Sequence, residues 1–481
     1  MHDLPLSSRG ASGSRPGSCG GPIGEMPLSK ALQALSVKRA TIGVDPLNDP
    51  IRAIRDSRSS CAASGFRKDR YNSSGFPMRI LTIAPQPFFQ PRGTPFSELY
   101  RARALTELGH EVDMVTYPIG EDVTMPGLRI LRTPRVPGIR RVRIGPSLAK
   151  IPLDALVFTS SLKRLLTNRY DLLDCHEEAG LMGVVLGRLF SVPVLYDMHS
   201  SLPEQLSNFQ YSRSRLLRAL FDWAERVTVK GSDAVIVVCP YLKDVVSATD
   251  RDKPCFLIEN SPLAESGEEI AGDEALRIRR ELGLEETFVI HYSGTFESYQ
   301  GLPLLYEAFR MVAETLPSAR LLMVGGTSLQ VDEAKREVAR HGLGERVVFT
   351  GQRPSSEMPR FLAISDVLVS PRSSGTNTPL KIYSYLRAGK PIVATRLLTH
   401  TQALDDECAA LAEPTPEAFA EALLALARDP KRRLQLGMGA RRLSEERYSY
   451  ARYMERTREV LDFVSKRLAS PGRAREAATD R

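Results

Sequence analysis

The sequence has few of the residues and patterns that mark several common classes of protein. Its six cysteines form no C-x-x-C pair, so neither a zinc site nor a disulfide framework is indicated. The longest apolar run, 180–187, ends at Arg188 and is far shorter than the roughly 20 residues of a membrane-spanning helix. The first residues also lack the apolar core of a signal peptide. We therefore expect a cytoplasmic protein without a bound metal.

The chain also lacks the concentrated positive charge of a nucleic-acid-binding protein. Its formal net charge is +8, but residues 1–77 hold 11 Lys and Arg against 6 Asp and Glu, which leaves 54 against 51 in the remainder. A protein that wraps phosphates carries far more basic charge on one face, so we expect no nucleic-acid partner. Hydrophobic residues make up 42% and charged residues 25%, which excludes collagen-like, coiled-coil and wholly disordered chains.

Two regions of different composition follow one another at the start of the chain. Residues 1–77 are rich in Ser, Gly, Arg and Pro and show little periodicity, which predicts a disordered extension. From Arg79 onwards strand-like and helix-length segments alternate, as in a parallel sheet covered by helices. A helix should begin at 93–95, bury Phe96, Leu99 and Leu108 on one face, and end at Gly109. The first domain, 78–260, is predicted to contain strands at 79–84, 111–117, 128–133, 172–175, 192–197 and 234–238.

The same alternation restarts after a polar, turn-rich segment at 260–273. Residues 261–445 are predicted to form a second domain with strands in FVIHYSG, ARLLMVGG, RVVFTG, DVLVSP and KPIVAT, and with Thr415 as the cap of a late helix. A terminal helix at about 446–467 and a disordered tail over 468–481 complete the prediction. The fold class is therefore α/β, with two tandem Rossmann-like domains, each a doubly wound parallel sheet.

Ligands of open parallel sheets bind at the carboxyl ends of the strands, so the loops at those ends are the candidate sites. Gly93 and Thr94 open a helix whose free amides could hold an anion or a polar acceptor, or could form only a tight turn. His199 follows a predicted strand and could contact a sugar hydroxyl or be a satisfied loop imidazole. The loop from Gly294 to Gly301 could hold a phosphate, although such turns are common in this fold.

The richest candidate loop is 370–395, SPRSSGTNTPLKIYSYLRAGKPIVAT. Thr378 and Pro379 should open a helix whose unpaired N–H groups and positive dipole end face a ligand, with Lys381 in its first turn. This arrangement favours an anion site over a helix that is merely well capped. The sequence contains no metal cluster, nucleophile elbow or Walker loop that we can identify.

Together, MRILTIAP, the H-S-S loop, G-x-x-x-x-x-x-G and the loop 370–395 resemble the retaining, nucleotide-sugar-dependent glycosyltransferases of family 4. The resemblance spans Met78 to about Arg467. It implies the GT-B fold, with an acceptor-binding N-terminal domain, a donor-binding C-terminal domain and a cleft between them. It also implies no metal and no cofactor other than the nucleotide-diphosphate sugar as co-substrate.

The family resemblance also assigns roles to individual positions. The histidine that matches His199 contacts the transferred sugar, and Gln352 and Arg353 match the loop that commonly holds the nucleobase. The family usually has an Arg and a Lys on the glycine loop for the diphosphate, and two glutamates for the sugar and the ribose. In this chain those four charged positions are occupied by Thr295, Gln300, Thr376 and Ser384.

The missing charges require a substitute if the donor site is active. We hypothesise that Lys381 pairs with the diphosphate, with Arg372 as the next candidate; the opposing interpretation is a lysine on the solvent face of its helix. Neutral hydroxyl groups of the donor could be bonded by Asn377, Thr378 and Ser384.

The leading hypothesis is transfer of a sugar, with retention, to a lipid-linked or polysaccharide acceptor in the synthesis of cell-envelope polysaccharide. A catalytically silent member that acts as a binding or partner subunit is the main alternative. A two-domain nucleotide-sugar epimerase fits less well, because no paired carboxylates stand out at the strand ends. The segment 132–150 holds six Lys and Arg and no acid, which predicts peripheral contact with anionic lipid at the inner face of the membrane unless it is a solvated loop.

Overall fold

The computed structural model describes residues 77–90, 93–139, 142, 147–204, 215–261 and 270–469. All of them belong to one compact unit, Ser64–Arg481. The disorder predicted for 1–77 lies outside these residues except at position 77, and the tail predicted over 468–481 lies outside them from 470 onwards. Within the described ranges, no helix is both long enough and apolar enough to cross a membrane.

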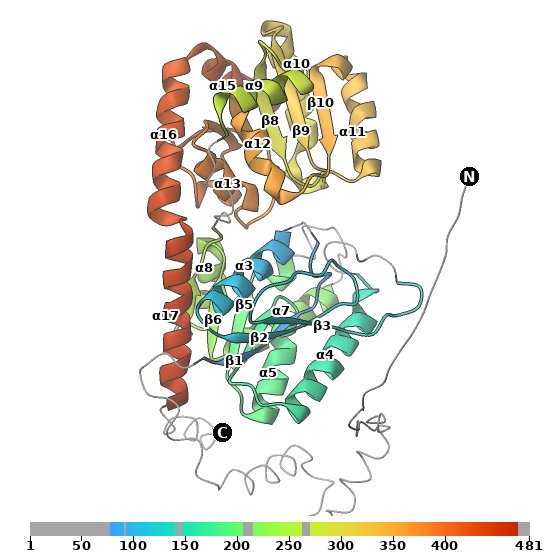
Figure 1. Cartoon of the computed structure of the whole chain (residues 1–481), viewed down its shortest axis with the longest axis vertical. Coiled ribbons are helices and arrows are strands. Elements are labelled where there is room, and N and C mark those ends of the chain that lie inside the picture. The colour runs from blue at the N-terminus through green and yellow to red at the C-terminus, as the bar shows by residue number, and fades with distance from the viewer. Residues whose placement is uncertain are drawn as a thin grey trace, which may run out of the picture. The chain divides into compact units, whose positions relative to one another are not determined.

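The first sheet consists of seven parallel strands in the order β3-β2-β1-β4-β5-β6-β7 (Figure 1). The order reverses between β1 and β4, which places a ligand crevice at the carboxyl ends of these strands. All six predicted strands are present within two residues of their predicted bounds, whereas the short edge strand β7 was not predicted. The strands are β1 (Arg79–Ala84), β2 (Glu111–Thr116), β3 (Leu128–Arg132), β4 (Leu172–His176), β5 (Val194–Met198), β6 (Ala234–Val237) and β7 (Cys255–Leu257).

Helices cover both faces of this sheet. The strand order and right-handed crossovers place α4, α5, α7 and α8 on one face and α3 on the other. Gly109 adopts the left-handed conformation predicted for it, with φ of 87°. The helices are α3 (Gly93–Glu107), α4 (Lys150–Thr167), α5 (Ala179–Phe190), α7 (Arg215–Gly231) and α8 (Pro240–Thr249).

The buried face of α3 differs from the predicted one. Phe96 and Leu99 are only half-buried, whereas Glu98 and Arg101 are almost completely enclosed, with 0% and 3% of their surface exposed. The apolar periodicity was misleading here because Arg101 is neutralised by contacts from distant parts of the chain, which its own helix cannot reveal.

The second sheet repeats the first pattern, in the order β10-β9-β8-β11-β12-β13. The five predicted strands are present, but β13 was not predicted because its sequence, AALA, has no strand-like pattern. Thr415 caps its helix as predicted, since its side chain accepts a hydrogen bond from the amide of Ala418. The strands are β8 (Phe288–Ser293), β9 (Ala319–Val324), β10 (Val347–Gly351), β11 (Val367–Ser370), β12 (Ile392–Thr395) and β13 (Ala409–Ala412).

The described part of this domain also contains seven α-helices and three short 3₁₀ helices. The stripe predicted on α10, which includes Leu305, Phe309 and Val312, is completely buried. The α-helices are α9 (Gly272–Glu281), α10 (Leu302–Thr315), α11 (Ser328–Arg340), α12 (Met358–Ala363), α13 (Leu380–Ala388), α14 (Leu398–Thr401) and α15 (Pro416–Arg428). The 3₁₀ helices are η3 (Ser298–Gln300), η4 (Gly344–Arg346) and η5 (Ser355–Glu357).

Two long helices end the described chain, α16 (Pro430–Arg447) and α17 (Tyr450–Ala469). The terminal helix predicted at about 446–467 corresponds to α17. This helix buries Val460, Leu461 and Val464 in one cluster with Ile80 of β1 and with other residues of the first sheet. The last helix of the chain is therefore part of the core of the N-terminal domain.

A chain that begins at Met78 should fold as the full chain does. Met78 is itself part of the core beneath α17, with 6% of its surface exposed, so no buried residue of the described ranges would be lost. We expect soluble expression and a Tm within about 3 °C of the full chain, a shift that corresponds to less than about 1 kcal/mol. A matched chain that begins at Thr82 removes half of β1 and should be insoluble. Insolubility of the chain from Met78 would contradict the prediction.

Candidate active site

A cavity of about 1600 Å³ lies at the carboxyl ends of the strands of both sheets. The N-terminal domain contributes the loop after β1, the start of α3, and the loops after β4 and β5. The C-terminal domain contributes the loops after β8, β9, β10 and β11 and the start of α13. Direct contacts join the two domains beside it: the Asn377 amide donates to the carbonyl oxygen of His199, and the Thr376 hydroxyl donates to Glu204 over 2.7 Å.

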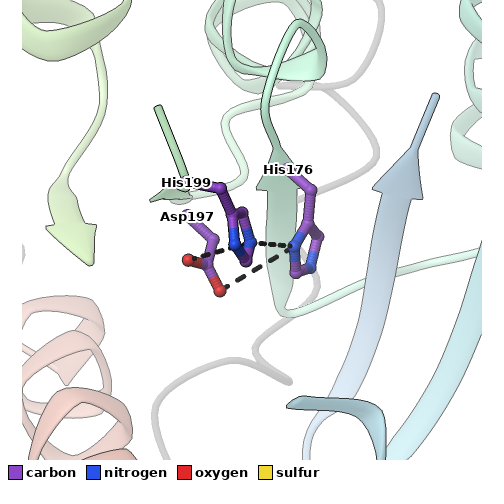
Figure 2. Close-up of side chains that lie close together, drawn as sticks. All are labelled: His176, Asp197 and His199. Atoms are coloured by element: carbon purple, nitrogen blue, oxygen red, sulfur yellow. Dashed lines mark hydrogen bonds and ion pairs between the residues drawn. The ribbon is translucent and has the colours of Figure 1, made fainter. Parts of the chain in front are cut away.

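On the N-terminal side, His199 belongs to a buried cluster of charged side chains (Figure 2). Its Nε2 lies 3.3 Å from Nδ1 of His176 and 3.4 Å from Oδ1 of Asp197. The other nitrogen of His176, Nε2, lies 3.1 Å from Oδ2 of Asp174. Arg101 Nε donates to Oδ2 of Asp197 over 3.2 Å.

Strand geometry produces this cluster. Side chains two residues apart on a strand point to the same face. Strand β4 ends in the pattern D-x-H at 174–176, and the same pattern at 197–199 begins at the end of β5 and includes the residue that follows it. The register of the two strands pairs His176 with Asp197, so the two patterns lie side by side. The repeated D-x-H is a signal that the sequence analysis missed. Sequence reasoning also missed Glu98 and Arg101, which reach the cluster from α3.

The protonation states follow from burial and from the neighbouring charges. Burial lowers the pKa of His199 to about 4, so its ring is neutral. Burial opposes the charge of His176 too, but the carboxylates of Asp174 and Asp197 outweigh it and raise its pKa to about 9. Protonated His176 then donates from Nδ1 to Nε2 of His199, which leaves Nδ1 as the N–H donor of the His199 ring.

Two imidazoles and one carboxylate can also bind a divalent cation. Ligand atoms of His176, Asp197 and His199 lie within 4.8 Å of one another, a grouping that the sequence analysis did not identify. A cation there would displace the proton of His176 and lie beside the guanidinium of Arg101. Burial raises the pKa of Glu98 to about 8, so its carboxyl group is uncharged at neutral pH. The charges of Arg101 and His176 then balance those of Asp174 and Asp197, and the cluster is neutral without a metal. The absence of a metal stays a prediction.

A pair of carboxyl groups follows β4, contrary to the sequence analysis, which found no paired carboxylates at the strand ends. Glu177 and Glu178 both line the cavity. Glu178 accepts a 2.6 Å ion pair from Lys150, and Glu177 accepts a hydrogen bond from the Ser200 hydroxyl over 2.9 Å. Burial, assisted by the charge of Glu178, raises the pKa of Glu177 to about 8. Glu177 also has a left-handed φ of 48°, a strained conformation for a residue with a side chain.

On the C-terminal side, two cations lie beside the glycine loop. Nζ of Lys381 lies 3.2 Å from Oε1 of Gln300 and 3.8 Å from the centre of the Tyr292 ring. The guanidinium of Arg372 lies 5.0 Å from the centre of the Tyr299 ring. Its Nη1 donates to the carbonyl oxygen of Asn377 over 2.7 Å, while its buried Nε has no hydrogen-bond partner in the described part of the chain.

Neither cation has a carboxylate partner among the described residues, and burial lowers the pKa of both Lys381 and Arg372. The alternative interpretation, a lysine on the solvent face of its helix, is therefore wrong for Lys381. Gly301 makes the arrangement possible: its φ is 71°, and a Cβ there would clash with the carbonyl oxygen of Pro371. Only glycine lets the loop approach β11 closely enough to bring Gln300 to Lys381.

Almost all residues that the sequence analysis proposed line the cavity, and Thr376 is the exception. Its hydroxyl instead bonds Glu204 of the other domain. Arg353 lies 3.9 Å from the carboxylate of Glu357 and is partly exposed. The roles of these residues stay predictions. Those that line the cavity are Gly93, Thr94, His199, Gly294, Thr295, Gln300, Gln352, Arg353, Asn377, Thr378, Lys381 and Ser384.

Two Rossmann-like domains that share a cavity at the carboxyl ends of their sheets define the GT-B class of glycosyltransferases. Residues 275–443 match the family "Glycosyl transferases group 1", and residues 99–254 match the "Glycosyl transferase 4-like domain". The chain belongs to the group 1 glycosyltransferases, as the sequence predicted.

The individual relatives share only a small fraction of their sequence with this chain. Sulfoquinovosyl transferase SQD2 of Arabidopsis thaliana is 24% identical over 66% of this chain, which spans 60% of that protein. Phosphatidyl-myo-inositol mannosyltransferase of Mycobacterium leprae is 25% identical over 73% of this chain and 88% of its own length. The solved sucrose-phosphate synthase of Thermosynechococcus elongatus has the same fold, with a TM-score of 0.68 and 20% identity over 81% of this chain and all of that one.

Proposed function

We propose that the protein transfers a sugar from a nucleotide-diphosphate sugar to an acceptor, with retention of configuration. The observation that carries the proposal is the pair of cations, Lys381 and Arg372, beside the cavity. A half-buried positive charge without a counter-charge is costly, and among the described residues neither cation meets a carboxylate. A diphosphate bound in the cavity would supply the missing negative charge. The C-terminal domain is then the donor-binding domain.

The charge that develops on the leaving diphosphate indicates which residues would assist the transfer. When the bond between the sugar and the diphosphate breaks, the electron pair passes to the leaving phosphate oxygen. The acceptor hydroxyl forms the new bond, and its proton passes to that phosphate oxygen. Lys381 and the N-terminal amides of α13 would stabilise the leaving diphosphate. Neutral His199, on the opposite side of the cavity, would donate a hydrogen bond to a sugar hydroxyl. Gln352 and Arg353 would contact the nucleobase.

A lipid-linked or saccharide acceptor belongs to the same proposal. One relative is named for sulfoquinovosyl transfer and another for mannosyl transfer to phosphatidyl-myo-inositol, and both names describe sugar transfer. Gly93 and Thr94, at the start of α3, lie on the N-terminal side of the cavity and would contact the acceptor. A role in synthesis of cell-envelope polysaccharide is part of the same proposal.

The carboxyl pair does not favour the epimerase. Proton transfer to and from one sugar carbon needs groups on opposite sides of the ring, whereas Glu177 and Glu178 are adjacent residues of one loop. Glu178 is moreover engaged by Lys150. Membership of the glycosyltransferase family favours transfer over interconversion.

The full chain should release a nucleoside diphosphate from one member of a panel of nucleotide sugars. The panel would combine different bases and sugars and be measured with and without saccharide and lipid-linked acceptors. A bound nucleotide should also raise the Tm, because a ligand at 100 times its Kd adds about 2.7 kcal/mol to stability. An interconverted sugar nucleotide would indicate an epimerase. Stabilisation without release would indicate a silent member and would overturn the proposed transfer.

A further inference from the structure

The apolar stripe of α7 faces away from the domain that carries the helix. Leu216, Leu220 and Trp223 occur at i, i+4 and i+7, on one side of the helix, and they are 82%, 53% and 55% exposed. The residues that α7 buries, Glu225, Thr228 and Val229, include two polar ones. Leu217 and Phe221 are half-buried as well, so the packed side of the helix is part polar and part apolar, and the exposed stripe lies beside it.

Positive charge borders this stripe. The four basic residues of α7, Arg215, Arg218, Arg226 and Lys230, are all exposed, and no ion pair involving them occurs in the described structure. At 3.6 residues per turn, Arg226 and Lys230 lie next to Trp223 around the helix. The acidic residues of α7 do not cancel this charge on the surface, because Glu225 is buried and Asp222 is half-buried.

The stripe lies at the carboxyl edge of the first sheet. The Glu225 carboxylate accepts a 2.8 Å hydrogen bond from the backbone amide of Leu202, which follows the end of β5. Because α7 runs back along the sheet towards β6, its residues before Glu225 extend beyond that edge. Ten residues at about 1.5 Å each span roughly 15 Å. This is the edge at which the cavity lies.

Other exposed apolar side chains share the helical layer to which α7 belongs. Among the described residues of the N-terminal domain, every large hydrophobic side chain that is strongly exposed lies on α7, on α5, or on or next to α4. The face covered by α3 and α17 has none. Besides the stripe of α7, these residues are Leu148, Ile151, Leu166 and Val185.

We propose that α7 docks the protein on an anionic lipid surface, with the stripe in the interfacial region and the basic residues at the headgroups. Leu and Trp on one side of a helix and Arg and Lys on the other are the features of interfacial helices. A second copy fits less well, because a symmetric contact through α7 would bring the same positive charges together. The proposal does not depend on sugar transfer.

The lipid contact predicted for the basic segment 132–150 stays a separate prediction. Arg132 bonds Asp122 and the carbonyl oxygen of Phe88, and Lys150 pairs with Glu178, so both are engaged within the protein. Arg140, Arg141 and Arg143 of that segment lie outside the described residues.

The single tryptophan of the chain is Trp223, so its fluorescence reports directly on α7. The full chain, without nucleotide, would be mixed with vesicles of phosphatidylcholine alone or of phosphatidylcholine with phosphatidylserine. We expect a blue shift of the emission and co-sedimentation with the anionic vesicles only. Both should disappear at 1 M salt, where the Debye length falls to about 3 Å.

Two double variants test the apolar and the basic residues of α7, and a third serves as the control. Leu216→Gln with Leu220→Gln should abolish the blue shift and leave the Tm unchanged, because both side chains are exposed. Arg215→Gln with Arg218→Gln should weaken vesicle partitioning by about 25-fold, which corresponds to the loss of two surface charges. Leu434→Gln with Met438→Gln, at two equally exposed positions of α16, should leave binding unchanged.

Three results would overturn the proposal. The first is an emission spectrum that anionic vesicles do not change. The second is vesicle binding that survives the change of Leu216 and Leu220, which would place the contact elsewhere. The third is a blue shift that depends on protein concentration without lipid, which would identify a second copy as the occupant. Nucleotide-sugar turnover in solution is measured separately, so failure of docking would leave the proposed transfer intact.

Discussion

Replacement of His199 by alanine should lower kcat by about 10²–10⁴-fold, the effect of removing a positioned polar group from a transition state. The ring lines the cavity, and His176 and Asp197 hold it on one side. The variant should also lose about 1–3 kcal/mol of stability, because protonated His176 is left without its buried hydrogen-bond acceptor. The measurement is single-turnover transfer with the donor that the panel identifies, alongside a thermal melt.

His341 offers a matched control, because it lies on the surface of the C-terminal domain beside Glu307. His341→Ala should retain full turnover. His199→Gln, which keeps an N–H donor, should recover part of the activity lost in the alanine variant. Turnover of His199→Ala close to that of the unmodified protein would reject the contact with the sugar.

Replacement of Lys381 by methionine should weaken binding of a nucleoside diphosphate by about 10²–10³-fold. An attraction of roughly 4 kcal/mol is expected for two unit charges 4 Å apart at an effective dielectric constant of 20. The corresponding nucleoside, which lacks the phosphates, should bind with unchanged affinity. Titration calorimetry with both ligands separates the two effects. Arg372→Met should act in the same direction, and Lys335→Met, on the exposed side of α11, should have no effect.

The ligand-free Lys381→Met protein should also be more stable than the unmodified protein. Burial lowers the pKa of Lys381 below 10.5, so between these two values the unfolded chain binds more protons than the folded one. The stability of the unmodified protein therefore rises with pH across that range, and a neutral side chain removes the penalty. Equal weakening of nucleoside and nucleoside diphosphate, without a gain in Tm, would show that the diphosphate charge is met elsewhere.

The sequence predicts the fold well because a buried parallel strand is a short apolar run between turns, and β1 or β8 can be recognised without knowledge of its neighbours. The prediction fails at β13, where AALA has no strand-like pattern. It also fails at α3, where the burial of Arg101 depends on partners from distant parts of the chain. The loops that carry the site were predictable from the strand ends. The environment of Lys381 was not, because it depends on the close approach of Gly301 to Pro371. The D-x-H patterns were visible, but only the register of β4 and β5 brings them together.

The packing of α17 on the first sheet has a consequence for synthesis of the chain on the ribosome. Helix α3 covers part of the face of that sheet formed by Ile80, Leu195 and Ile236, and the rest is covered only when residues 450–469 have emerged. All described strands of the C-terminal domain are synthesised before that helix. The domain that is made first therefore completes its core last, and its apolar face must wait, in contact with water or a chaperone, while the second domain folds.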